Sequence, residues 1–341
     1  DGIRDHCVTG VQTCALPISP GSPRQSLASV VARLVSPGLR RHAAGVPKLQ
    51  SRAWSLLLLW LTCACSAPRL ERVPAESFAI PLPGVSGRID HLAYSAATHT
   101  IYVAALAAGQ LLAVDVGAMR VTGVVSGLAE PQGIAVLPGD RVVVACGGDG
   151  SVRGFTANGL TPLASCMAGA DADNVRLHLA AERLMVGVQD GVFVGQLGTL
   201  QPIATWPLPG HAESFQIDSV RQRVYVNVPD AARVMALDLA SGRTIASARP
   251  SAARNYPMAL DAENGWLLVG CREPAGIAVF AADSLRERQF VPAVGDMDDL
   301  FIDERSRMVY AIGGEGFVDR FAIGEDGTLV QRERLATRAG S

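Results

Sequence analysis

Apolar and polar positions repeat with a period of about 42 residues from Arg88 to the end of the chain. Each repeat opens with a tetrad of mostly polar residues, and the six tetrads end at His91, Gln132, Asn174, Ser214, Pro257 and Asp299. About ten residues after each tetrad comes a short apolar run: Ile101–Ala104, Val142–Ala145, Leu184–Val186, Val224–Val226, Leu267–Val269 and Met308–Ala311. A period of this length, filled with short strands, is typical of the blades of a β-propeller, so we predict an all-β fold.

The first repeat shows the expected blade in detail. Its apolar runs predict four strands, at His91–Tyr94, Ile101–Leu106, Leu111–Val116 and Val121–Val125. In later repeats the second and third strands are separated by turns such as Gly148–Gly150 and Asp190–Gly191. A glycine after an acidic residue supplies the positive φ that tight hairpin turns need. We therefore predict four-stranded blades whose first strands run along a central channel.

The residues before the repeats divide into three segments of different character. Residues 1–19 contain Cys7–Ile18, which resembles a translated sequencing adapter, and residues 20–45 form a leader of unassigned origin. Residues 46–66 have the pattern of a secretory signal, and residues 67–341 are expected to form the propeller domain. The apolar run of the signal is about ten residues long, too short for a membrane-spanning helix of about 20 residues.

The signal segment predicts export from the cytoplasm. Lys48 and Arg52 form a basic region, and the apolar stretch Ala53–Thr62 follows them. The next residues resemble a bacterial lipoprotein box with Cys65 as the lipidated residue, and a simple cleavage after Ser66 or Ala67 is the alternative. We expect a periplasmic or secreted protein that touches a membrane only through this lipid anchor.

Composition and charge narrow the classes of function. The chain is 49% hydrophobic and 18% charged, which allows a large core, and its net charge of −2 provides no electrostatic attraction to nucleic acid. Outside the leader and signal, the cysteines are Cys146, Cys166 and Cys271, and we expect free, buried thiols. No Cys-x-x-Cys or His/Cys metal spacing occurs, so no cofactor is expected from the motifs.

Several tetrads and their flanks resemble the YncE-like (YVTN-repeat) propeller family. The segments that carry the resemblance are Gly87–Leu92, Leu128–Gly133, Asp171–Arg176, His211–Gln216, Asn255–Asp261, Asp298–Phe301 and Gly313–Asp319. The resemblance implies an exported propeller with seven blades, in a family whose members mostly have no assigned activity. It also extends more distantly to lactonase-type propellers.

The number of repeats is lower than the resemblance implies. Six tetrads are present, and Phe78–Pro81 has the character of an outer strand that would close the ring against the last blade. We expect a seven-bladed type with a truncated last blade, and therefore an open side between the first and last blades. The alternative is a six-bladed ring in which the N-terminal strand displaces the outer strand of the sixth blade.

The tetrads also carry the candidate chemistry, because the loops that enter the first strands of a propeller converge at one mouth of its channel. The converging polar residues are Arg88, Asp90, His91, Glu130, Gln132, Asp171, Asp173, Asn174, His211, Glu213, Ser214, Arg254, Asn255, Asp296, Asp298 and Asp299. All of them except Asp171, Ser214, Arg254 and Asp296 are predicted to contact a ligand. The pattern favours a module that binds a small polar ligand or a protein partner.

Two catalytic or metal-dependent alternatives use the same residues. A lactonase-like hydrolase would use His91, Glu130 or Glu213 as general base and Arg88 or Arg254 to stabilise the oxyanion, although no Gly-x-Ser-x-Gly elbow occurs. A divalent metal would bind His91 or His211 together with nearby carboxylates. A periplasmic haem protein is a weaker variant, in which His91, His178 and His211 are ligand candidates by residue type alone. Against all of these stands a purely structural role, in which Asp and Asn side chains cap turns.

Overall fold

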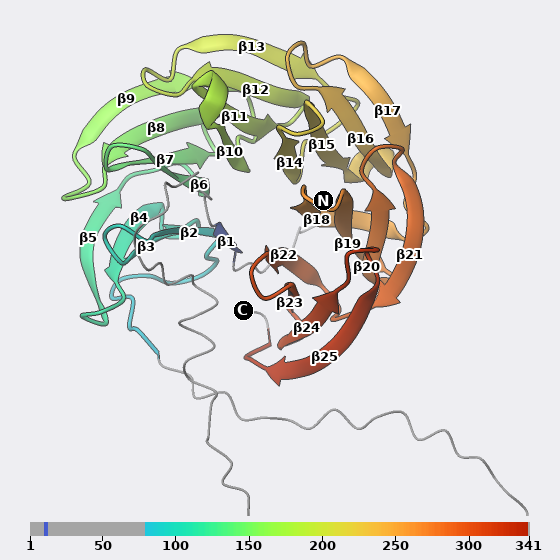
Figure 1. The fold of residues 1–341 in the computed structure, drawn as a ribbon. Helices are drawn as coiled ribbons and strands as arrows, with labels where there is room; N and C mark the ends of the chain where they lie inside the picture. The colour runs from blue at the N-terminus through green and yellow to red at the C-terminus, as the bar shows by residue number, and fades with distance from the viewer. Residues whose placement is uncertain (1–9, 13–78, 340–341) are drawn as a thin grey trace, which may run out of the picture.

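The predicted propeller is present. A computed structural model describes residues 10–12 and 79–339, and in this part of the chain six sheets are arranged around a central axis (Figure 1). Each sheet contains four consecutive antiparallel strands, and β1 (Gly10–Gln12) adds to the first of them in parallel with β2. The chain is therefore an all-β propeller of four-stranded blades. No helix among the described residues is long and apolar enough to cross a membrane.

The first three blades follow the repeat closely. Their strands are β2 (His91–Ser95), β3 (Thr100–Ala105), β4 (Gln110–Asp115), β5 (Arg120–Ser126), β6 (Pro131–Leu137), β7 (Arg141–Cys146), β8 (Ser151–Thr156), β9 (Pro162–Met167), β10 (Val175–His178), β11 (Arg183–Val188), β12 (Gly191–Gln196) and β13 (Pro202–Pro207). A short 3-10 helix at Leu179–Ala181 joins β10 to β11. The four strands predicted in the first repeat coincide with β2–β5 to within one residue at every end.

The last three blades have the same order. Their strands are β14 (Phe215–Asp218), β15 (Arg223–Val228), β16 (Arg233–Asp238), β17 (Thr244–Ala248), β18 (Ala253–Asp261), β19 (Trp266–Glu273), β20 (Ala275–Ala281), β21 (Arg286–Pro292), β22 (Met297–Asp303), β23 (Met308–Gly313), β24 (Phe317–Ile323) and β25 (Leu329–Ala336). A second 3-10 helix, Pro229–Ala231, joins β15 to β16. All six apolar runs seen in the sequence lie within the second strands of their blades.

Every blade has a register shift between its third and fourth strands. In the fourth blade, for example, Ala236 pairs with Ala246 and Leu237 pairs with Thr244, which leaves Ile245 as an extra residue on the outer strand. The same irregularity occurs between the third and fourth strands of the other five sheets. A bulge of this kind increases the local twist of the strand that carries it.

Hydrophobic cores lie between the blades rather than within them. Five clusters of buried residues each join two consecutive blades, from the first and second to the fifth and sixth. The second strands β7, β11 and β15 are accordingly buried on both faces after their first residue, and β19 is buried from Leu267 to Cys271. Close approach is part of this packing: a Cβ on Gly187 would lie 2.3 Å from the Ala212 carbonyl oxygen of the next blade, whereas Gly198 faces open space.

The first and sixth blades do not share such a core in the described part of the chain. The free face of the first blade, at Val103 and Leu112, is covered by Ile80, Leu82 and other residues of the segment that precedes β2. In the sixth blade, β23 alternates between half-buried and buried residues, because only one of its faces packs against a neighbouring blade. Within the described residues, therefore, no core joins the first blade to the sixth, and the blades number six where the resemblance implies seven.

The predicted closing strand is wrong. Phe78 lies outside the described residues, and residues 79–81 do not form a strand. Ile80 packs against the first blade, and β25 occupies the outer position of the sixth blade. The alternative of a six-bladed ring closed by an N-terminal strand fails for the same reason. The adapter-like stretch apart from Gly10–Gln12, the leader, the signal segment and Cys65 also lie outside the described residues.

Candidate functional site

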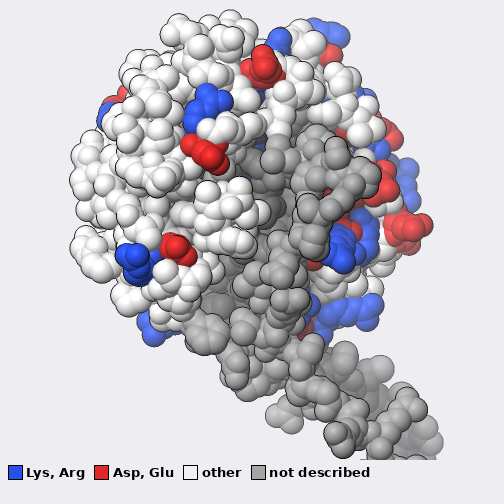
Figure 2. Space-filling model, turned by 60° about the vertical axis from the view of Figure 1, so that its left-hand side comes forward, with Lys and Arg blue, Asp and Glu red and all other residues white. Residues whose placement is uncertain are grey.

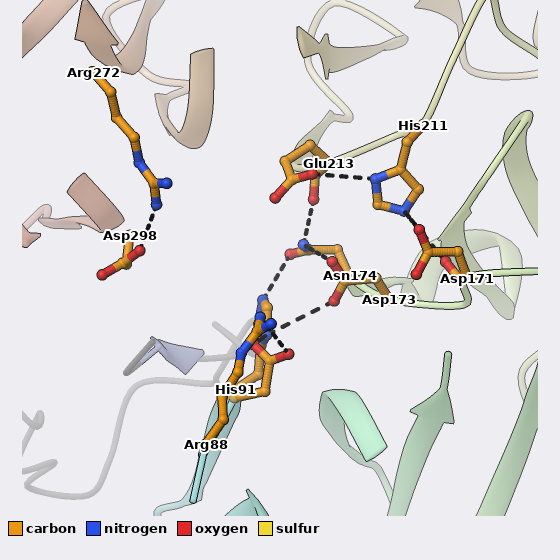
Figure 3. Close-up of polar contacts among 10 residues, drawn as sticks. Arg88, His91, Asp171, Asp173, Asn174, His211, Glu213, Arg272 and Asp298 are labelled. Carbon is orange, nitrogen blue, oxygen red and sulfur yellow. Dashed lines mark hydrogen bonds and ion pairs between the residues drawn. The ribbon is translucent and has the colours of Figure 1, made fainter. Parts of the chain in front are cut away.

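The backbone fixes each tetrad at the entrance to a first strand. The third residue of a tetrad pairs with the second strand of its blade: the Asp90 N–H donates to the Ala104 carbonyl (2.8 Å) and the Asp173 N–H to the Gly187 carbonyl (2.9 Å). The chain turns just before this point, where Asp171 and other residues adopt positive φ. Side chains from several blades therefore gather at this end of the channel: Figure 3 shows those of blades one, three and four in contact with one another, and a pair from blades five and six apart from them.

His91 is the first centre of the resulting polar network. Its Nδ1 lies 3.0 Å from Asp90 Oδ1 and 3.8 Å from Asp173 Oδ1, and its Nε2 lies 3.3 Å from Asn174 Oδ1. Arg88 donates to the other oxygen of Asp90 (3.2 Å). The contact with Asn174 links the first blade to the third and bypasses the second, so it crosses the channel end rather than following the ring.

His211 is the second centre. Its Nδ1 lies 3.2 Å from Glu213 Oε2, and its Nε2 lies 3.2 Å from the Asp171 carbonyl oxygen and 3.7 Å from Asp171 Oδ2. The Asn174 amide group donates to the Glu213 carbonyl oxygen and so connects the two histidine centres. Asn174 and Glu213 thus join His91 and His211 in one network (Figure 3).

A separate cluster lies between the fifth and sixth blades. Arg272, at the end of β19, donates to Asp298 (2.5 Å) and to the Met297 carbonyl (3.2 Å), and it forms an ion pair with Asp296 (3.1 Å). Its guanidinium also stacks on the ring of Tyr256, at 4.3 Å from the centroid. Figure 3 shows Arg272 and Asp298 at the left of the view, apart from the two histidines. Arg272 was not predicted as a site residue because it lies outside the tetrads. The signal available in the sequence was an arginine near the end of an apolar strand.

Four predicted residues lie outside these clusters. Glu130 is exposed and Gln132 is half-buried, and neither forms a hydrogen bond with a network residue in the described part of the chain. Arg254 is exposed and pairs with Glu273 (3.0 Å). Asn255 is fully buried and donates to Asn227 Oδ1 (3.0 Å) and to the Arg233 carbonyl oxygen (2.9 Å), so it joins the fourth and fifth blades instead of facing a ligand.

Ser214, a tetrad residue with no predicted ligand role, is buried. His178, a haem candidate by type, ends β10 at the opposite end of the strand from Asn174. It therefore does not join His91 or His211. Within the residues that the structure describes, no group of three or more His, Cys, Asp or Glu side chains is close enough to hold a metal ion, so neither histidine gains support as a metal ligand.

Both network histidines are held in the charged form. Burial alone would lower the pKa of His91, but the carboxylates of Asp173 and Asp90 outweigh it and raise the pKa to about 10. Burial likewise opposes protonation of His211, and Glu213 and Asp173 raise its pKa to about 9. A histidine whose two ring nitrogens both face acceptors is a double donor. It has no lone pair for a proton or a metal ion, so His91 and His211 are poor general bases as they stand.

The carboxyl groups show the opposite effect. Burial raises the pKa of Asp173 to about 7 against the nearby charge of His91, and it raises the pKa of Asp298 to about 7 against Arg272. Burial also raises the pKa of Asp299 to about 7, although the positive charges of His91 and Arg176 act to lower it. Clustered groups with perturbed pKa values are typical of functional sites, although structural networks produce them as well.

The outer surface does not offer a competing charged site on the side seen in Figure 2. In the described part of that face, acidic and basic side chains lie next to one another, and no broad area carries one sign of charge.

Two of the three free cysteines are too deeply buried to act as reactive nucleophiles. Cys146 and Cys271 are buried, and burial raises the pKa of their thiols to about 11 and about 12. A thiol of that kind is a weak nucleophile.

Comparison with known proteins shows the fold and no more. No protein-family model and no curated protein matches the chain. Among solved structures, the chain is similar to a functionally unknown protein from Desulfotomaculum acetoxidans DSM 771, with a TM-score of 0.61 and 12% identity over 68% of this chain and 78% of that one. It is also similar to a chain of the mitotic checkpoint complex, with a TM-score of 0.66 and 14% identity over 84% of this chain and 89% of that one. At these identities the likeness supports the propeller architecture alone.

Proposed function

We propose that this chain is an exported YncE-like propeller that binds a small polar ligand at the channel mouth formed by its tetrads. The observation that carries the proposal is the polar network around His91, Asn174 and His211, which joins three blades at the position where their first strands begin. A network that served stability alone would have its buried polar atoms satisfied. Among the described residues, seven buried side-chain atoms have no hydrogen-bond partner, and three of them lie in the two polar clusters: Arg88 Nε and Asp173 Oδ1 in this network, and Asp298 Oδ2 in the Arg272 cluster.

Binding is favoured over hydrolysis by the state of the candidate bases. His91 and His211 each present both ring nitrogens to acceptors, and Glu130 and Arg254 lie outside the network. We therefore expect no hydrolysis of a panel of lactones that depends on His91. Any turnover seen with the unaltered chain should persist in His91→Ala. Turnover that is lost in His91→Ala while the protein stays folded would reverse this preference.

The binding proposal is tested by ligand-dependent stabilisation. A ligand that binds only the folded state raises the melting temperature, by an amount that grows with its concentration. The purified chain is screened by thermal melts against sugars, amino acids, organic acids and amines. A hit should lose its effect in Asn174→Ala and keep it in Glu130→Gln, which changes an exposed tetrad residue outside the network. The proposal fails if no compound raises the melting temperature, or if a hit is insensitive to Asn174→Ala.

Export and lipidation are supported by the sequence pattern around Cys65. A basic region, a short apolar run and small residues before a cysteine form a lipoprotein-type signal. In a bacterial host, mass spectrometry of the mature protein should find an N-terminal lipidated Cys65, and Cys65→Ala should abolish incorporation of a labelled fatty acid. An unmodified mature chain that begins after Ser66 or Ala67 would establish export without lipidation.

A further inference from the structure

Two buried carboxylate oxygens at the channel mouth have no hydrogen-bond partner. They are Asp173 Oδ1 and Asp298 Oδ2, on side chains that are only 9% and 1% exposed. His91 Nδ1 lies 3.8 Å from Asp173 Oδ1, which is an ion-pair contact but too long for a hydrogen bond. A buried acceptor without a donor costs about 1–3 kcal/mol. The site therefore has two positions at which a ligand N–H or O–H would relieve that cost.

The charges around these oxygens are unbalanced in one direction. Arg272 is shared by two carboxylates, Asp296 and Asp298, at 3.1 Å and 2.5 Å. His91 is likewise shared by Asp90 and Asp173. Arg88 also pairs with Asp90, so in the network around the two histidines three positive groups, Arg88, His91 and His211, face the four carboxylates of Asp90, Asp171, Asp173 and Glu213. Each cluster thus has one carboxylate more than it has positive groups, so negative charge remains after pairing.

The electrostatics of the buried acids agree with this imbalance. Burial raises the pKa values of Asp173, Asp298 and Asp299 to about 7 in spite of the cations nearby. The existing positive charges therefore do not fully compensate for the loss of water around these carboxylates. A positively charged ligand at the site would stabilise the ionised form of these carboxyl groups and lower their pKa values. Protons that the carboxyl groups hold near pH 7 would then be released on binding.

The geometry separates this ligand class from the other candidates. An anion would meet a surplus of carboxylates, and a bare divalent metal ion would need a group of closely spaced ligands that the described residues do not contain. A neutral polyol would supply hydrogen-bond donors but no charge. An ammonium or guanidinium group supplies both, because all of its N–H groups are donors and it is positively charged.

Building on the proposed function, we infer that the channel mouth binds a small organic cation that carries primary ammonium or guanidinium groups, whose N–H groups donate to the free oxygens of Asp173 and Asp298. Asp298 is held in place by Arg272, and Asp173 by its backbone pairing with Gly187. Both acceptors are thus positioned before the ligand arrives. Ordering them in advance reduces the entropic cost of binding.

Isothermal titration calorimetry with three probes tests the inference. The probes are agmatine, which has an ammonium and a guanidinium end, inositol as a neutral polyol, and citrate as an anion. Agmatine should bind, and Asp173→Asn and Asp298→Asn should each weaken its binding at least tenfold because the variants remove the negative charge. Glu130→Gln serves as the matched control and should bind agmatine like the unaltered chain.

Proton counting provides a second readout that does not depend on how well the variants fold. Titrations of the unaltered chain near pH 7, in buffers with different ionisation enthalpies, should show that agmatine releases protons. Binding of inositol or citrate without agmatine would overturn the inference and leave the proposed function intact. Agmatine binding that releases no protons and is unchanged in both Asn variants would also overturn it. If none of the probes binds and the wider ligand screen gives no hit, both the inference and the proposed function fail.

Discussion

Tyr102 provides a direct test of how the blades are joined. Its side chain is fully buried, and its hydroxyl donates to the Ala157 carbonyl oxygen of the second blade at 3.0 Å. Tyr225 occupies the same repeat position in the fourth blade and bonds the Ala282 carbonyl oxygen of the fifth blade at 2.9 Å. These tyrosines form a latch between the second strand of one blade and the turn that precedes the outer strand of the next.

The sixth blade contains a natural control for this latch. Tyr310 has the same repeat position, but it is half-buried and its hydroxyl bonds no residue in the described part of the chain. It contacts Arg320, whose guanidinium lies over its ring at 5.5 Å. Replacement of Tyr310 by Phe therefore removes a hydroxyl without breaking an interblade hydrogen bond.

The expected magnitudes differ clearly. Tyr102→Phe removes a buried hydrogen bond and leaves the Ala157 carbonyl without this donor, which should lower the free energy of unfolding by about 1–2 kcal/mol. For a domain of this size, each kcal/mol corresponds to a fall in melting temperature of about 2–4 °C. Tyr310→Phe should change the free energy of unfolding by no more than about 0.5 kcal/mol.

Urea unfolding followed by circular dichroism, with thermal melts as a check, measures both variants against the unaltered chain. Unchanged far-ultraviolet spectra would show that both variants keep the fold. Equal losses for Tyr102→Phe and Tyr310→Phe, or no loss for Tyr102→Phe, would refute the idea that the buried hydroxyl stabilises the joint between blades.

Three further predictions concern packing, pH and thiol chemistry. Gly187→Ala should lower the melting temperature by several degrees because its Cβ would collide with the backbone of the next blade, and Gly198→Ala should leave it unchanged; similar melts for the two variants would contradict the packing argument. The pKa of His211 is raised from 6.5 to about 9, so its stabilising charge is present below pH 6.5 and is lost as the pH rises through about 9. His211→Gln should therefore destabilise the chain more in melts at about pH 6 than at about pH 10, and the reverse order would disprove the charged state. In the native protein a thiol reagent should modify Cys166, which is half-buried, before Cys146, as judged by peptide mapping, and early modification of Cys146 would show that its blade opens.

The blade architecture could be predicted from sequence because it depends on local patterns. Burial on both faces makes each second strand a continuous apolar run, such as Val142–Ala145 in β7, and the period of the repeat sets the order of the strands. Convergence of the tetrads follows from the same symmetry. Asp90, His91, Asp173, Asn174, His211 and Glu213 were all identified in this way, and the structure brings them into one network.

The orientation of individual side chains could not be predicted, because it depends on small departures from the repeat. Strand β18 begins at Ala253, so the tetrad of the fifth blade lies within the strand, and a register shift after Asn255 directs that residue towards the fourth blade. Glu130 has a positive φ, and its side chain is exposed at the turn. Arg272 enters the site from a second strand, a position that the repeat pattern does not mark as polar.

The register shift in every blade has a consequence for self-association. Outer strands are the exposed edges of the six sheets, and a flat edge with apolar residues can pair with the edge of another molecule. Several outer strands here carry an exposed apolar residue: Val124, Leu163, Ile203, Ile245 and Val330. Ile203 and Ile245 are themselves the extra residues of their bulges, so the ladder is interrupted where the apolar side chain protrudes. A rim built in this way resists the edge-to-edge stacking that leads to fibrous aggregates.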